Sequence, residues 1–151
     1  MSHFSKQVTF YVLSNKTQGK DELSAQENLA CDLTAQAWRE GKKVLLVCND
    51  EAQAFRLDEA LWQRSPEEFV PHNLSGELTR TTPPIEITWG NKRNSQMRQL
   101  LINLQTEVPS YFNSFNQIID FVPSKEEEKV PARERYKFYR QQGWQLQTEQ
   151  V

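Results

Sequence analysis

Two short apolar segments, each followed by an amphipathic helical pattern, constrain the fold of this chain more than any other feature. Residues 7–13 (QVTFYVL) and 43–48 (KVLLVC) are rich in β-branched and aromatic residues, which is typical of strands buried on both faces. Ser24 and Glu27 match a capping box ahead of a helix that ends near Gly41. A strand–helix–strand order of this kind predicts a parallel sheet with right-handed crossovers.

The remainder of the chain continues the same alternation. Asn49 or Asp50 is suited to cap a second helix. Further strands are expected at residues 85–89, 100–104 and 117–122. A C-terminal helix is expected from Pro131, as an N1 residue, to Gly143, followed by a last strand or an extended tail at residues 144–148.

The chain as a whole therefore predicts an α/β fold with one domain. A mostly parallel, Rossmann-like sheet flanked by helices should span residues 1–151, and residues 1–6 should form a flexible N-terminus. No run of about 18 apolar residues and no signal-peptide core occurs, so neither a membrane span nor export is expected. Cys31 and Cys48 stand far apart without a CxxC pattern, which favours two buried thiols in the reducing cytoplasm.

Charge limits the nucleic-acid functions that the chain could have. The formal net charge is -2 with 25% charged residues, which argues against binding of nucleic acid by the whole surface. A local basic patch at Lys92, Arg93 and Arg98 stays open as a weak DNA-binding alternative, since no aromatic residues are interleaved with it.

Motifs for nucleotide binding and catalysis are missing where the fold would need them. Ser14 to Gln18 follow the first strand without a GxGxxG pattern, and no phosphate loop or GxSxG motif exists. No cofactor is therefore expected. Glu86 and Asp120 are the best pair of strand carboxylates for a divalent-metal nuclease. Pairing of each acid with a neighbouring Lys or Arg is the favoured alternative.

The C-terminal helix carries a basic row with an aromatic residue inside it. Arg133, Tyr136, Lys137 and Arg140 follow an i, i+3, i+4, i+7 spacing, and Lys129 joins them if the helix extends one turn back. Such a row suits a partly apolar ligand that bears a carboxylate. From the helix alone, a solvated surface helix is the favoured interpretation. The opposite side offers a poor apolar stripe: Ala132, Arg135 and Tyr139.

Large apolar side chains also follow the second helix. Trp62 ends that helix, and Phe69 and Pro71 come shortly after a polar run. Aromatic residues beside proline at a helix end can close a core, or they can anchor a protein interface. Without further information, core packing is the favoured interpretation.

Taken together, these residues resemble the family of chi subunits of bacterial DNA polymerase III. The resemblance runs from about Val8 to Thr148. It is carried by the following segments in order: 9–11 (TFY), 56–62 (RLDEALW), 69–74 (FVPHNL), 84–87 (PIEI), Trp89 with 92–93 (KR), 120–123 (DFVP) and 132–137 (ARERYK). The family's C-terminal helix usually starts earlier, whereas Pro131 here predicts a start after a loop at residues 124–129.

The resemblance implies a replication adaptor with an α/β fold and no catalytic activity. It implies binding to the psi subunit of the clamp-loader complex and to the acidic C-terminal tail of single-stranded DNA-binding protein, so that contact with DNA is indirect. The implied tail-binding residues are Val122, Lys129, Arg133, Tyr136, Lys137 and Arg140. The implied psi-binding residues are Trp62, Phe69 and Pro71, and the same patch resembles a contact for a helicase-like partner. The implied location is the cytoplasm, at the nucleoid through the replisome.

Overall fold

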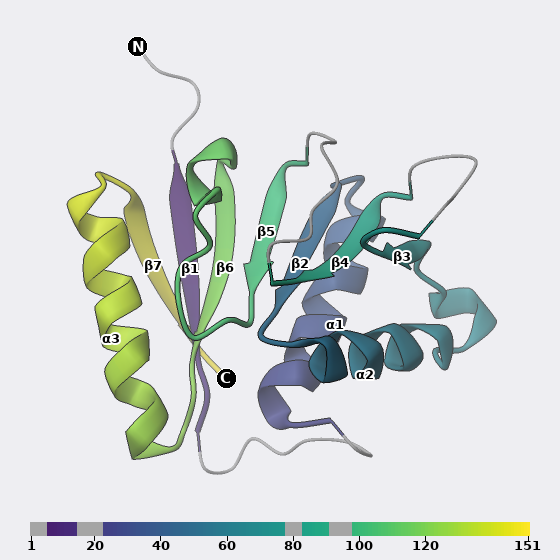
Figure 1. The fold of residues 1–151 in the computed structure, drawn as a ribbon, viewed down its shortest axis with the longest axis horizontal. Helices are drawn as coiled ribbons and strands as arrows, with labels where there is room; N and C mark the ends of the chain where they lie inside the picture. The colour runs from purple at the N-terminus through teal and green to yellow at the C-terminus, as the bar shows by residue number, and fades with distance from the viewer. Residues whose placement is uncertain (1–5, 15–22, 78–82, 91–97) are drawn as a thin grey trace.

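A seven-stranded parallel sheet forms the centre of the computed structural model, which describes residues 6–14, 23–77, 83–90 and 98–151. The strand order is β3-β4-β2-β5-β6-β1-β7, and each pairing is parallel (Figure 1). The strands are β1 (Gln7–Val12), β2 (Val44–Cys48), β3 (His72–Leu74), β4 (Ile85–Trp89), β5 (Leu100–Asn103), β6 (Gln117–Val122) and β7 (Gln145–Gln150). The predicted α/β class with a Rossmann-like sheet is confirmed.

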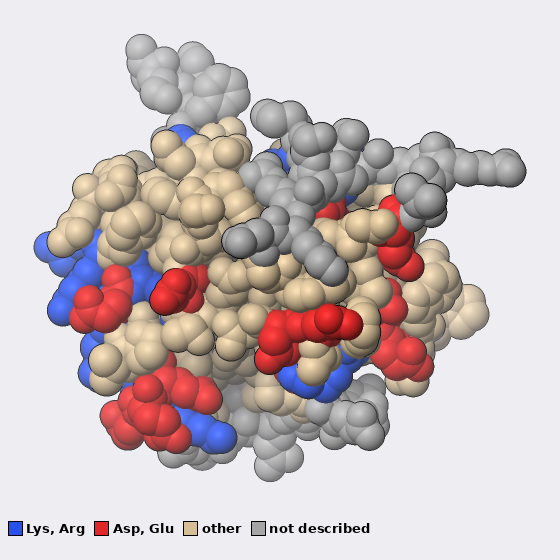
Figure 2. All heavy atoms as spheres, in the orientation of Figure 1, with Lys and Arg blue, Asp and Glu red and all other residues tan. Residues whose placement is uncertain are grey.

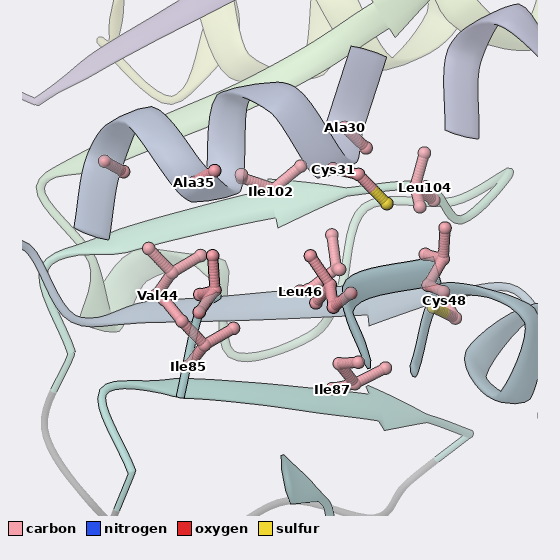
Figure 3. Packing of buried hydrophobic residues seen from close by; sticks show 14 of the residues in the cluster. Ala30, Cys31, Ala35, Val44, Leu46, Cys48, Ile85, Ile87, Ile102 and Leu104 are labelled. Atoms are coloured by element: carbon pink, nitrogen blue, oxygen red, sulfur yellow. The ribbon is translucent and has the colours of Figure 1, made fainter. Parts of the chain in front are cut away.

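Helices cover both faces of this sheet. The helices are α1 (Ala25–Arg39), α2 (Glu51–Trp62) and α3 (Glu126–Gln141), with two 3-10 segments, η1 (Pro66–Glu68) and η2 (Phe112–Ser114). Alternate side chains of β2 point to opposite faces. Val44 and Leu46 pack with α1 and α2 (Figure 3), whereas Leu45 and Val47 belong to the cluster beneath α3. The sheet therefore separates two apolar cores.

The helix caps agree with the sequence patterns. Ser24 Oγ accepts a hydrogen bond from the Glu27 amide at 3.1 Å, and the Glu27 carboxylate accepts one from the Ser24 amide at 3.1 Å. The capping box is thus confirmed. Asp50, not Asn49, caps α2, because its carboxylate accepts from the Gln53 amide at 2.8 Å.

The start of the C-terminal helix differs from the prediction. Lys125 is the N-cap, and α3 runs from Glu126 with Pro131 inside it, so the expected loop at 124–129 and the N1 placement of Pro131 are wrong. Proline at this position removes one intrahelical hydrogen bond, and its ring crowds the carbonyl one turn earlier. The acidic first turn of residues 126–128 interacts favourably with the helix N-terminus and so stabilises this start.

The first and last strands of the chain pair at one edge of the sheet. The segment after Gly143 is a strand, β7, which pairs with β1. Residues 1–5 of the expected flexible N-terminus lie outside the described residues. Lys6 is held, because its Nζ donates to the Asn113 carbonyl at 2.6 Å and its own carbonyl accepts from the Gln145 amide at 2.9 Å.

Both cysteines lie within the apolar core, as predicted. Burial raises the pKa of Cys31 to about 12 and also raises the pKa of Cys48. In the part of the chain that the structure describes, no helix combines the length and apolar character that a membrane span requires.

Candidate protein-binding surfaces

One flank of α3 carries most of the implied tail-binding residues. We call it the basic flank of α3 and define it by Lys129, Arg133, Tyr136, Lys137 and Arg140. The helical start at Glu126 places Lys129 on the same flank as the others. Figure 2 shows Lys and Arg atoms along the outer edge of α3 and a group of Asp and Glu atoms at its N-terminal end.

The cations of this flank differ in how far they are already neutralised. Lys129 Nζ lies 2.9 Å from Glu126, and Lys137 Nζ lies 3.7 Å from Glu134. Arg133 and Arg140 are exposed and form no ion pair with another described residue. These two guanidinium groups are the most available for an external carboxylate, which Arg can bind through two parallel hydrogen bonds.

An apolar wall lies beside these cations. Tyr136 is partly buried, with its ring centroid 5.3 Å from that of Phe10. Val122, at the end of β6, is also partly buried and packs against the same apolar cluster. Cationic and apolar groups of the implied tail site therefore border one region of the molecule.

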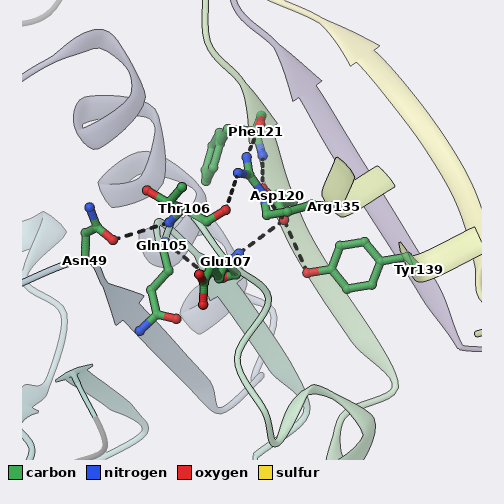
Figure 4. Close-up of polar contacts among 9 residues, drawn as sticks. Asn49, Gln105, Thr106, Glu107, Asp120, Phe121, Arg135 and Tyr139 are labelled. Atoms are coloured by element: carbon green, nitrogen blue, oxygen red, sulfur yellow. Dashed lines mark hydrogen bonds and ion pairs between the residues drawn. The ribbon is translucent and has the colours of Figure 1, made fainter. Parts of the chain in front are cut away.

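The stripe of α3 that faces the sheet is held by a buried ion pair. Asp120 of β6 accepts from Arg135 Nε at 3.1 Å and 3.2 Å, through its two oxygens, and from the Tyr139 hydroxyl at 3.2 Å (Figure 4). Arg135 also donates to the carbonyls of Thr106 at 2.8 Å and Phe121 at 3.0 Å. Hydrogen bonds to Asp120, rather than a wide apolar stripe, thus attach this side of α3 to the sheet.

Burial governs the titration of this network. Complete burial raises the pKa of Asp120, and the charge of Arg135 opposes that rise. Burial, followed by the nearby Asp120 charge, raises the pKa of Tyr139. Tyr139 therefore stays protonated and donates to Asp120.

The fold keeps the two carboxylates of the nuclease alternative apart. Glu86 lies on β4 and Asp120 on β6, with β2 and β5 between them. Three interstrand spacings separate the two carboxylates by about 14 Å or more, too far for one metal ion to bind both. Glu86 pairs with buried Arg98 at 3.2 Å, and Asp120 pairs with Arg135. Among the described residues, no group of three or more His, Cys, Asp or Glu could hold a metal.

The DNA-binding alternative is also weakened. Arg98 is buried, and its Nη1 donates to the carbonyls of Pro83 at 3.0 Å and Pro84 at 2.6 Å. Its cation is consequently turned inward, away from any phosphate. Lys92 and Arg93 lie outside the described residues.

Aromatic side chains form a second surface where α2 ends. Trp62 is 58% exposed, with its ring 5.2 Å from Phe69 and 5.2 Å from His72. Phe69 and Pro71 are partly buried. The expectation that Trp62 closes the core is thus wrong for this residue, whose ring is left largely on the surface.

A buried histidine supports this aromatic pair. His72 Nδ1 lies 2.7 Å from the Val70 carbonyl, and Nε2 lies 3.1 Å from the Asp58 carboxylate. Burial raises the pKa of Asp58, and the charge of His72 opposes that rise. The His72 ring, held by these contacts, packs edge-on against the Trp62 ring.

Sequence reasoning missed two features. Phe55 is 48% exposed on α2, and the available signal was its spacing of seven residues from Trp62. A crevice of about 390 Å³ opens at the carboxyl ends of the strands, with Asn49, Gln105 and Ser124 among its lining residues. Ligands of open α/β sheets usually bind at this edge, but the glycine-rich turn that holds phosphate is absent from the sequence after β1.

A family model and three relatives that match nearly the whole chain share one description. The profile of the family described as DNA polymerase III chi subunit, HolC, matches residues 6–147. DNA polymerase III subunit chi of Haemophilus influenzae is 56% identical over 97% of this chain and 99% of its own length. The Escherichia coli protein of that name is 51% identical over 95% of this chain and 97% of its own length. The protein of that name from Pseudomonas aeruginosa is 35% identical over 95% of this chain and 96% of its own length.

Solved structures of low sequence similarity share the fold. T4 UvsW matches with a TM-score of 0.64 at 9% identity, over 97% of this chain and 41% of that one. Saccharomyces cerevisiae Dbp5, in a complex with Nup159, Gle1, IP6 and ADP, matches with a TM-score of 0.60 at 10% identity, over 97% and 42%. At these identities the similarity supports the α/β architecture alone.

Proposed function

The chain belongs to the family of DNA polymerase III chi subunits, and on this premise we propose that it is a non-catalytic adaptor of the replication machinery. In this proposal it binds the psi subunit of the clamp-loader complex and the acidic C-terminal tail of single-stranded DNA-binding protein. The polymerase is thereby linked to coated template without direct contact between this chain and DNA.

The observation that carries the tail-binding proposal is the pairing of the two cations without an ion pair to another described residue, Arg133 and Arg140, with an apolar wall formed by Tyr136 and Val122. Arg133 or Arg140 binds the terminal carboxylate, while Val122 and Tyr136 contact the terminal apolar residue. Burial of one large apolar side chain contributes about 1.5–3 kcal/mol. Lys129 and Lys137 attract the other acids of the tail, an exposed contribution that salt screens.

A peptide titration tests this site. A synthetic peptide of the partner's acidic C-terminus is titrated into the wild type and into Arg133→Ala and Tyr136→Ala. Each variant should weaken binding about tenfold, the range of interface anchors. Arg39→Ala, which removes an exposed cation from α1, serves as the matched control and should bind as the wild type does. Unchanged affinity in both folded α3 variants rejects the site.

The second part of the proposal assigns psi binding to the aromatic surface of Trp62, Phe69 and Pro71. Its support is the largely exposed Trp62 ring, packed against Phe69 and fixed from below by His72. Large aromatic residues with supported rings are typical interface anchors. Co-purification with the psi subunit should be lost in Trp62→Ala and strongly reduced in Phe69→Ala. Full recovery of psi with both variants would assign this surface to another partner, such as a helicase-like protein.

A further inference from the structure

A second aromatic pair lies along α2 from Trp62. The Phe55 ring centroid is 5.9 Å from that of Trp89, in an edge-to-face arrangement. Phe55 and Trp62 are seven residues apart, so they lie on the same side of α2 and about 10 Å apart along its axis. Phe55 contacts the end of β4, and Trp62 contacts the start of β3. We call this side of the helix, defined by Phe55, Asp58 and Trp62, the aromatic flank of α2.

The middle residue of the aromatic flank, Asp58, is polar, and its side chain is held in place by a neighbour. Asp58 lies one turn from both Phe55 and Trp62, and it is held 3.1 Å from the Nε2 atom of buried His72. Single exposed apolar residues are normal on protein surfaces. Two aromatic pairs, aligned on one helix with a fixed carboxylate between them, form an ordered surface instead.

Acidic side chains surround the aromatic flank. Its exposed acids are Glu51, Glu59, Glu67, Glu68 and Glu77. Figure 2 shows Asp and Glu atoms gathered on the right-hand side, over α2 and the β3 end of the sheet.

Among the residues that the structure describes, the cations nearest these acids, Arg56 and Arg64, are already in ion pairs. Arg56 lies 2.7 Å from Glu27, and Arg64 lies 3.3 Å from Asp32 and 3.7 Å from Glu68. The rim is therefore opposite in sign to the basic flank of α3, and it repels an acidic peptide.

The adjacent sheet edge offers little to an extended partner. The edge strand β3 has three residues, and the Leu74 amide already donates to Glu77 at 2.7 Å. Strand addition gains its affinity from a longer row of free backbone groups. A helix laid beside α2 instead meets both aromatic pairs, because its own apolar side chains recur every seven residues.

We propose that the partner of the aromatic surface presents a basic amphipathic helix that lies along the aromatic flank of α2. Apolar side chains two turns apart contact the Phe55/Trp89 and Trp62/Phe69 pairs, and Lys or Arg side chains face Asp58, Glu59 and Glu51. This inference rests on the proposed psi-binding function and specifies the chemistry of that contact.

The test measures the affinity of purified psi subunit for single variants of the full chain by calorimetric titration. Phe55→Ala should weaken binding about tenfold, as an anchor at the second aromatic pair would. Glu59→Lys should also weaken it, because it places a like charge opposite the basic helix. The matched control Glu149→Lys, on the opposite sheet edge, makes the same charge change and should have no effect.

The outcomes separate this inference from the function on which it rests. Loss of psi binding in Trp62→Ala, with wild-type affinity in Phe55→Ala, overturns the extended helix site and leaves the smaller surface intact. Wild-type affinity in Glu59→Lys overturns the basic character of the partner. Wild-type affinity in both Trp62→Ala and Phe55→Ala contradicts the proposed psi site itself. Thermal melts that match the wild type confirm that each variant is folded.

Discussion

Helices α2 and α3 present the two candidate surfaces, and they are attached to the sheet in different ways. The buried residues of α2 are Ala54, Leu57 and Leu61, which pack on an aliphatic core. The buried residues of α3 are Ala132, Arg135 and Tyr139, two of which bond to Asp120. Aliphatic packing is non-directional, whereas the Asp120 bonds fix the rotation of α3. The basic flank of α3 is therefore presented in one orientation.

The largest expected effect comes from breaking the ion pair beneath α3. Arg135→Met removes the partner of a fully buried carboxylate, and an uncompensated buried charge costs about 3–5 kcal/mol. Urea unfolding measures the loss. The control Arg133→Met changes an exposed residue of the same helix and should stay within about 0.5 kcal/mol of the wild type. A loss below about 1 kcal/mol in Arg135→Met would contradict the role given to this pair.

The corresponding change beneath α2 removes apolar packing. Leu57→Ala leaves a cavity in the core and should cost about 2–5 kcal/mol in urea unfolding. Phe55→Ala, two positions earlier, should cost about 1 kcal/mol or less because half of its ring is exposed. Equal losses in the two variants would mean that Phe55 is part of the core and would remove it from the aromatic flank.

A smaller effect on stability is expected from pH, through Glu27 of α1, which accepts hydrogen bonds from Gln53 and Arg56 of α2. Burial alone would raise the pKa of Glu27, but hydrogen bonds from Arg56 at 2.7 Å and Gln53 at 3.0 Å lower it below its ordinary value of 4.5. A carboxylate with a lowered folded pKa stabilises the fold above its unfolded pKa, and that contribution is lost as the pH falls through the folded pKa.

Thermal unfolding between pH 6 and pH 3 measures this contribution. The wild type should lose stability as the pH falls below 4.5, and Glu27→Gln should lose less over the same interval while being less stable at pH 6. The same pH dependence in both proteins would show that Glu27 does not contribute to the acid sensitivity.

Salt should distinguish the components of tail binding and gives the smallest predicted effect. The charges on the basic flank of α3 are exposed, so added salt should weaken binding of the acidic peptide several-fold. Contact with Val122 and Tyr136 should preserve measurable binding in high salt. Titrations at several salt concentrations report both parts, and an affinity independent of salt would mean that Arg133 and Arg140 do not contribute.

The sequence predicts the elements whose signals are local. Alternating buried strands and amphipathic helices identified β1, α1, β2 and α2, and the Ser24/Glu27 capping box located the start of α1. The strand order could not be predicted, because it depends on crossovers between segments far apart in the chain. The start of α3 was also missed, because the pattern places Pro131 at the first helical position, whereas the helix tolerates it inside, after an acidic first turn.

The candidate sites show the same division. Four members of the basic flank of α3, from Arg133 to Arg140, follow from spacing within one helix, whereas Lys129 joins them only through the observed helix start. The sequence predicts that Asp120 and Glu86 each pair with a Lys or Arg, but not with which one. Arg135 and Arg98 reach them from other parts of the chain. Phe55 was missed because the residue beside it, Ala54, belongs to the apolar stripe, and only the fold shows that the Phe55 ring lies outside the core.

Chemical-shift mapping with the acidic tail peptide tests the contrast between the two surfaces most directly. The account predicts that saturating peptide shifts the resonances of Val122 and of α3 from Arg133 to Arg140, and leaves Phe55 and Trp62 unchanged. Shifts centred on the aromatic flank of α2, or an unperturbed spectrum of the folded protein, would contradict it.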